Sequence, residues 1–300
     1  MLNRLTPLYP AISAHEVRSH LRATGDEEAG LIESYILAAQ QEIESNCERA
    51  LAAAKYELVL PKWPENSYVT SKRLPFEGTQ FRTVKGSVIG LEMPPILKVE
   101  SIQYYDDDNV SQTVSSYDLC SKTEPGELRP ELDETWPDIY SRWDAITITF
   151  WAGHVIPLTL DDANDKFVSV TGYPFADDDT LVISKSGNTN TFVGDVAVLP
   201  TGVSANTTYH VVNASGSGFQ IASSSGGSAV TLGAPTASGE AVDLLFAGKL
   251  DPMYRLILMN IAAKSWSERC ASGSCACTGD DFDHDPLLSK LKWRSPAEWI

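Results

Sequence analysis

The stretch DAITITFWAGH, at residues 144–154, decides how the chain is organised. Ile146, Ile148 and Phe150 alternate with Thr and Trp, which is the pattern of a strand with one buried face. The Gly-His pair that follows is expected to stop the strand. The sequence therefore predicts a strand with a sharp end, and the composition of the chain changes soon after it.

Residues 159–248 differ from the rest of the chain in composition. They contain no Trp, no Cys, 11 of the 20 Gly and only 11 charged residues, whereas the other 210 residues contain 52 charged ones. From Leu250 onward, the composition again resembles that of the first part of the chain, with Trp residues and a long apolar stretch. Because a surface connection accepts a long insertion at small cost in loop entropy, we expect two domains: a discontinuous host, 1–157 and 249–300, and an inserted β domain, 158–248.

The host is expected to be α+β and mainly helical, with a small antiparallel sheet. Ser13-x-x-Glu16 is a capping box that opens a helix reaching about Arg22. Apolar residues at three-and-four spacing then predict a helix of about 28 residues that ends at Ala54. The glutamates of this helix lie off the apolar stripe and are expected to face solvent, namely Glu28, Glu33, Glu42, Glu44 and Glu48.

Alternation also predicts strands at 56–60, 96–105 and 117–120. An acidic turn at 106–109 is expected to fold 110–114 back as a hairpin, and it lacks the ligand spacing of a calcium loop. Residues 124–129 are expected to form a turn and an edge strand, and 64–90 a loop with short strands. A last, buried helix is expected from Asp251, as its N-cap, to about Arg269.

In the insert, short apolar runs alternate with Gly, Asn, Asp and Pro turns. Six or seven strands at about ten-residue spacing predict a small β sandwich or barrel. The runs are 167–170, 180–184, 195–199, 208–213, 218–222, 229–232 and 241–246.

The formal net charge of −17 opposes a protein that grips nucleic acid, because such binding needs clustered Lys and Arg. It remains compatible with a channel through which DNA slides without sticking. No apolar run of about 18 residues exists and the N-terminus lacks the apolar region of a signal peptide, so we expect a soluble protein, intracellular where it is made, with no membrane partner.

Motifs of catalysis are absent. The sequence contains no G-x-S-x-G, P-loop, H-E-x-x-H or G-x-G-x-x-G, so we expect no enzyme and no cofactor. The histidines are interpreted as ordinary surface or boundary residues. Cys270, Cys275 and Cys277, with His284, match no standard zinc spacing, so the five cysteines are interpreted as free thiols and no metal is expected.

With the insert removed, the order of elements resembles the head-tail connector (head-completion adaptor) family of tailed bacteriophages. The resemblance is carried by residues 13–21, 26–54, 94–106, 117–119, 125–128 and 145–153 and by the helix after Asp251-Pro252. This chain departs from the family in the insertion itself and in Lys264-Ser-Trp266-Ser, where relatives read apolar-Trp-Tyr. Within the insert, 199–202, 207–213 and 218–221 resemble a small β module that recurs in tailed-phage structural proteins.

The resemblance implies a structural virion protein of the head-tail junction, assembled in the host cytoplasm. It would form a ring, dodecameric in the family, beneath the portal protein, extend the DNA channel and dock tail or tail-completion proteins. Further copies of the chain are thus expected partners, as are tail fibre or capsid proteins through the insert, and DNA would pass without specific binding. The alternative is a receptor- or carbohydrate-binding tail component that acts through the inserted domain.

The C-terminal tail, residues 286–300, is expected to bind the portal. It follows a Gly- and Asp-rich hinge and carries more large apolar area than an unpaired segment normally exposes. In the connector family the equivalent end reaches into the portal; the alternative is that the tail folds back on the host core. The candidate portal-binding residues are Leu287, Leu288, Leu291, Lys292, Trp293, Arg294, Trp299 and Ile300.

Overall fold

The structure is a computed structural model that describes residues 1–21, 29–64, 88–132, 134–185, 199–204, 206–233 and 245–271. The chain divides into two compact units, which are described separately. The first consists of Met1–Leu5 and Lys55–Ala152, and the second of Thr6–Ala54 and Gly153–Ile300. The division into a host and an inserted domain remains a prediction.

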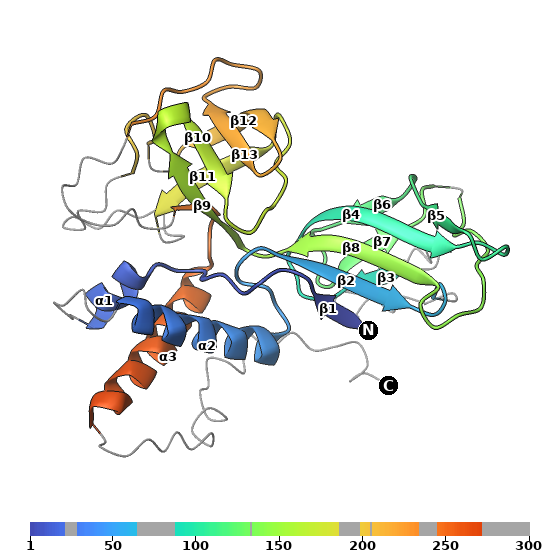
Figure 1. Cartoon of the computed structure of the whole chain (residues 1–300), viewed down its shortest axis with the longest axis horizontal. Helices are drawn as coiled ribbons and strands as arrows, with labels where there is room; N and C mark the ends of the chain where they lie inside the picture. Colours follow the sequence, from blue (N-terminus) through green and yellow to red (C-terminus); the bar gives the residue numbers. More distant parts are fainter. Residues whose placement is uncertain are drawn as a thin grey trace, which may run out of the picture. The chain divides into compact units, whose positions relative to one another are not determined.

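The first unit is built on a five-stranded sheet whose middle strand is β8, the strand quoted at the start (Figure 1). Ile146, Ile148 and Phe150 are fully buried and Thr147 and Thr149 are half-buried, so the expected alternation is confirmed as far as Phe150. Trp151, which was expected on the opposite face with the two Thr, is only 3% exposed. The Phe150 ring stacks on Tyr56 of the neighbouring strand with centroids 5.8 Å apart. The order is β1 (Leu2–Arg4), β2 (Ala54–Leu60), β8 (Ile146–Ala152), β4 (Ile96–Tyr105), β5 (Ser111–Thr113).

A second, three-stranded sheet in this unit has the order β3 (Ile89–Leu91), β7 (Gly126–Arg129), β6 (Asp118–Cys120). The expectation that residues 124–129 form an edge strand is therefore wrong. Strand β7 is central because β3, in a stretch without clear periodicity, pairs with its second edge. A Cβ at Gly126 would lie 2.5 Å from Ile96 Cγ1, so the close approach of that side chain requires glycine.

The second unit contains the three described helices, α1 (Ala14–Leu21), α2 (Ala29–Cys47) and α3 (Pro252–Ala271). Both predicted N-caps are confirmed: Ser13 Oγ accepts from Glu16 N at 3.3 Å, and Asp251 Oδ1 accepts from Met253 N at 2.8 Å. An ion pair between Glu16 and Arg255 links α1 to α3. The shared apolar core comprises Val17, Ile32, Ile36, Ile43, Ile257, Leu258 and Ile261, among others.

Helix α2 is shorter than the sequence predicts. Glu48 adopts a left-handed conformation (φ 52°), and Arg49 N donates to Glu44 O at 3.3 Å, which is a Schellman end. The left-handed position after a helix is usually Gly. Because Glu48 occupies it here, the sequence carries no recognisable signal for the end of the helix. Glu44 was expected to face solvent, yet it is 4% exposed. Its Oε1 accepts from Gln40 Nε2 and from Leu51 N, each at 2.9 Å, and so fixes the chain after the helix.

Residues 51–54 are buried but not helical. Leu51 O accepts from the backbone N–H groups of His154 and Val155, and Ala53 N donates to Val155 O at 2.7 Å. A Cβ at Gly153 (φ 150°) would meet the Ala53 backbone at 2.5 Å, so glycine is needed where the two segments touch. The pairing of this small-residue run with a distant segment overrides its helical pattern.

The expectation of a mainly helical host is wrong. The described residues form 14 strands and three α-helices, and strands outweigh helices. The physical reason is that short segments such as β3, β6 and β7 gain their hydrogen bonds only from partners distant in sequence, so a local pattern underestimates them.

The β region of the second unit is a closed six-stranded barrel, which confirms a small barrel as one of the two expected forms (Figure 1). Phe167, Phe219, Val211 and Ile221 fill its interior and are fully buried. Residues 229–232 were expected to be a strand and are not, whereas β9 was not expected. The strand order is β10 (Lys166–Ser169), β13 (Gly218–Ala222), β12 (Thr208–Ser215), β11 (Thr180–Lys185), β14 (Leu245–Gly248), β9 (Val155–Asp161).

The first and last strands of the barrel contribute side chains to the apolar core of the helices. Val155 of β9 and Phe246 of β14 are fully buried and belong to the same apolar core as α2 and α3. Strands β9 and β14 pair with each other, Val155 opposite Gly248. The chain therefore enters and leaves the barrel side by side, as the ends of an insertion must.

Candidate interaction surface

Large apolar side chains are exposed at few places in the described residues, and the segment before β8 holds three of them. Leu132 is 79% exposed, Tyr140 45% and Trp143 75%. A folded protein gains little from a Trp held in water. Tyr140 and Trp143 belong to the segment 136–144, named here the Trp143 loop, which contacts in the first unit hold in place.

The base of the Trp143 loop is held by aromatic contacts. Trp136 stacks on Trp63 with centroids 4.6 Å apart and planes 9° from parallel. The Trp63 indole N–H also donates to Pro137 O at 2.8 Å. Because Trp63 in turn contacts Tyr104 of β4, with centroids 6.3 Å apart, the loop is fixed to the sheet at its first residues.

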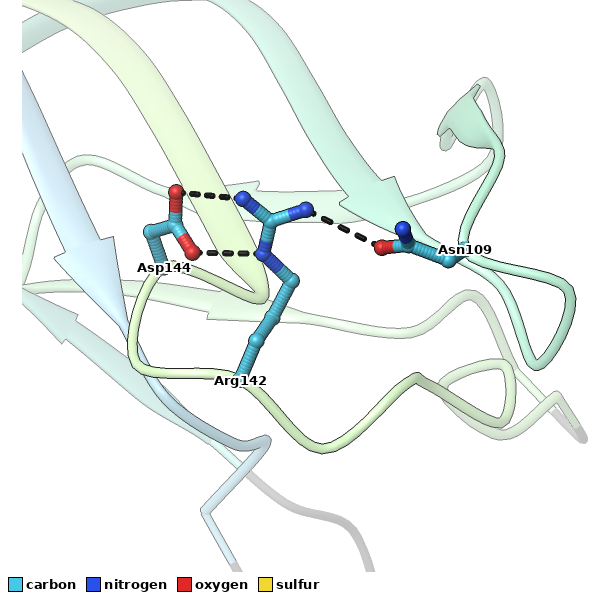
Figure 2. Close-up of polar contacts among 3 residues, drawn as sticks. All are labelled: Asn109, Arg142 and Asp144. Atoms are coloured by element: carbon cyan, nitrogen blue, oxygen red, sulfur yellow. Dashed lines mark hydrogen bonds and ion pairs between the residues drawn. The ribbon is translucent and has the colours of Figure 1, made fainter.

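Arg142 holds the far end of the loop (Figure 2). Its guanidinium donates to both carboxylate oxygens of Asp144, at 2.5 and 2.8 Å, and to Asn109 Oδ1 at 3.0 Å. It also lies over the Tyr105 ring, with Cζ 3.8 Å from the centroid. Tyr140 N donates to Tyr105 O at 2.9 Å. A bidentate, stacked arginine of this kind restrains the loop geometry more than a lysine could.

The acidic turn at 106–109 supports this arrangement. Asp106 accepts from Val110 N at 2.9 Å and from Gln112 Nε2 at 2.8 Å, and the hydrogen bond from Gln112 lowers the pKa of Asp106. Asn109 takes a left-handed conformation (φ 59°) in this turn. The turn joins β4 to β5, which pair antiparallel as the predicted hairpin. The turn thus places the amide oxygen of Asn109 where Arg142 can donate to it.

Electrostatics favour the charged form of both partners in the loop. Hydrogen bonding to Arg142 lowers the pKa of Asp144, and the same bond raises the pKa of Arg142. The positive charge of Arg142 and the negative charge of Asp144 compensate each other, so this pair adds no net charge to the loop. A hollow of about 450 Å³ adjoins it, lined by Pro61, Lys62, Ile139, Ser141, Arg142 and Trp143.

These features are typical of a protein-binding surface. Trp, Tyr and Arg are the residue types most enriched at binding hot spots, and a restrained loop loses little conformational entropy on binding. The sequence analysis missed this loop because it has no strand or helix period. The signal it did contain was a Pro-interrupted cluster of aromatics, with Trp136, Tyr140 and Trp143 in eight residues.

The tail residues expected to bind the portal, 286–300, lie outside the described residues, as do Cys275, Cys277 and His284. Neither Cys47 nor Cys120 is in a disulfide. Within the described residues, no cluster of three potential ligands could hold a metal ion. The helices in the described part are too short or too polar to span a bilayer.

His154 packs against the Tyr254 ring, with centroids 5.4 Å apart.

Residues 12–78 match the model of a family described as phage gp6-like head-tail connector proteins. The resemblance to the head-tail connector family is thereby confirmed. The matched stretch includes α1, α2 and β2, which correspond to the first helix, the long helix and the strand after it in the resemblance. No curated protein matches the chain.

Solved structures of gene transfer agent (GTA) particles also align with 51% of this chain. The neck of the empty particle, computed with C6 symmetry, has a TM-score of 0.39, 25% identity and 71% of its chain covered. The neck of the native particle, computed with C12 symmetry, has a TM-score of 0.38, 23% identity and 70% covered. The virion of the native particle gives 0.37, 23% and 72%.

Proposed function

We propose that the chain is a structural protein of the head-tail connector of a tailed phage or a related particle. Copies of it form a ring beneath the portal, continue the DNA channel and offer a platform to tail proteins. The match of residues 12–78 to a head-tail connector family carries this proposal.

Two physical features support it. The net charge of −17 disfavours retention of DNA by counterion release, which suits a channel wall. The restrained Trp143 loop offers an aromatic surface for protein contacts, and a ring needs such surfaces on each subunit.

Deletion of the gene from the producing phage or particle tests the proposal. The expected result is DNA-filled heads without tails, restored by supplying the full chain. Normal tailed particles that only fail to adsorb to cells would contradict it and favour the receptor-binding alternative. The mass of the isolated assembly gives the copy number: a ring near twelve copies agrees with the dodecamer, whereas a trimer does not.

The portal contact is proposed for the tail, at Leu287, Leu288, Leu291, Lys292, Trp293, Arg294, Trp299 and Ile300. Truncation after Asp285 is expected to leave the helix content unchanged and to abolish attachment to DNA-filled heads. The matched control replaces Lys290 by Ala, which leaves all eight residues in place and is expected to attach. A truncated protein that attaches normally would overturn this part of the proposal.

A further inference from the structure

A second apolar patch lies on α3, in the other unit of the chain. Met253 is 39% exposed and Leu256 43%, and they lie three residues apart on one helix face. Asn260 continues this exposed face, which carries no charge before Lys264. Among the described residues, the α3 face and the Trp143 loop are the places where exposed apolar side chains gather away from the N-terminus.

Both patches carry little net charge on a strongly acidic protein: in the Trp143 loop, Asp138 is the one acidic residue outside the Arg142–Asp144 pair. Two copies of a chain with a net charge of −17 repel each other, so contact costs least where acidic groups are absent or compensated. Arg142 and Asp144 compensate each other in the loop, and Met253, Leu256 and Asn260 are uncharged on the helix. The electrostatics therefore allow a second copy to bind here.

The two patches also differ in a complementary way. The Trp143 loop has a hollow lined by Pro61, Ile139 and Trp143, while α3 presents projecting Met and Leu side chains. Lys62 lines one part of the hollow, and exposed Asp251 lies beside Met253.

We infer that the Trp143 loop of one copy binds the exposed face of α3, at Met253 and Leu256, in a neighbouring copy. Unlike patches in contact make a heterologous interface, which closes into a ring when the rotation between copies allows it. This inference rests on the ring assembly proposed above and names the surfaces that would build it.

Two full-length variants test the contact, Trp143→Glu and Leu256→Glu, which place like charges in the two patches. Each removes one patch and places a charge in it, so each alone is expected to self-associate at least about 30-fold more weakly than the wild-type chain, as hot-spot loss implies. An equal mixture of the two retains one intact contact per pair. Sedimentation should then show a heterodimer that grows no further.

Controls separate assembly from folding. Leu5→Arg changes an exposed apolar side chain (49%) in neither patch and should assemble as wild type. Circular dichroism must show native helix content for each variant. A second pair, Tyr140→Glu and Met253→Glu, repeats the test at other residues of the same patches if either first variant fails to fold.

The outcomes distinguish this contact from the proposed function. If the wild-type chain stays monomeric at its highest soluble concentration, the proposed self-assembly fails and the contact fails with it. If the wild-type chain assembles and the variants assemble equally well, only the contact is wrong. Variants that fail to assemble alone and also fail to pair when mixed overturn it too, because some other contact then uses these residues.

Discussion

At the scale of single residues, Glu44 is buried although its position in the helical pattern predicts that it faces solvent. Its place off the apolar stripe of α2 indicates solvent, yet its carboxylate accepts from Gln40 and from the Leu51 backbone. Gln40 itself accepts from Ala11 N at 2.9 Å. This buried network joins the segment before α1, the helix α2 and the chain that follows it.

Replacement of Glu44 by Ala is expected to lower the free energy of unfolding of the helical unit by about 2–4 kcal/mol. The change leaves two buried donors unsatisfied, and each costs about 1–3 kcal/mol. Urea unfolding followed by circular dichroism measures the loss. Glu42→Ala, a half-buried position of the same helix, is the control and should change the stability by less than about 0.5 kcal/mol. Equal effects of the two substitutions would refute the role of Glu44.

Asp144 gives a prediction for pH. Its pKa is lowered in the folded chain by hydrogen bonding to Arg142, so its contribution is present above the ordinary Asp pKa of about 3.9 and is lost as the pH falls through the lowered value. The Trp143 loop should therefore keep its structure from neutral pH down to about 4 and loosen below that. Carboxyl chemical shifts from NMR measure the titration of Asp144, and Arg142→Gln should return its pKa toward the ordinary value. An unshifted pKa in the wild-type chain would contradict the geometry in Figure 2.

At the scale of elements, the Trp143 loop depends on contacts from three other parts of the first unit. Trp63 follows β2, Tyr104 and Tyr105 end β4, and Asn109 belongs to the turn after it. None of these partners is near the loop in sequence. The sheet brings these partners together, and their contacts restrain the loop.

Trp136→Ala is expected to loosen the Trp143 loop while the sheet stays folded. The change removes the ring that stacks on Trp63 and anchors the base of the loop. Hydrogen exchange at the Tyr140 amide, which donates to Tyr105 O, should become at least about tenfold faster, corresponding to 1.4 kcal/mol. Trp143→Ala removes an exposed ring of equal size from the same loop and should leave this exchange rate unchanged. Protection that survives Trp136→Ala would show that Arg142 alone suffices.

At the scale of the whole molecule, the barrel combines the character of an insertion with a share in the helical core. Its first and last strands pair with each other, which suits removal as a unit. However, Val155 and Phe246 at its base are buried among residues of α2 and α3. Removal of the barrel must therefore spare these two side chains.

Replacement of residues 159–244 by a short Gly-Ser linker is expected to leave a soluble chain with native helix content and a cooperative thermal transition. A flexible linker adds only a small loop-closure cost, and Val155 and Phe246 remain to fill the core. Phe246→Ala in the full chain is the matched comparison and should cost about 3–5 kcal/mol, as buried Phe truncations do. An insoluble or molten deletion variant would show that the division into host and insert is wrong.

The sequence by itself determined the features that depend on neighbours along the chain. The capping box at Ser13, the N-cap at Asp251, the alternation of β8 as far as Phe150, the hairpin at 106–109 and the barrel strands β10 to β13 were predicted, because local hydrogen bonds and periodicity specify them. The family resemblance followed from the order of these elements and was confirmed over residues 12–78.

Only the tertiary structure decided where α2 ends, that β7 is central and that strands outweigh helices. Each depends on a partner far along the chain: the residues near Val155 for the run at 51–54, β3 for β7, and the sheet for the Trp143 loop. Long-range pairing satisfies backbone groups and buries surface at a distance that no local period encodes. The exposed Trp143 became visible as a candidate binding residue only when the contacts that restrain it were in place.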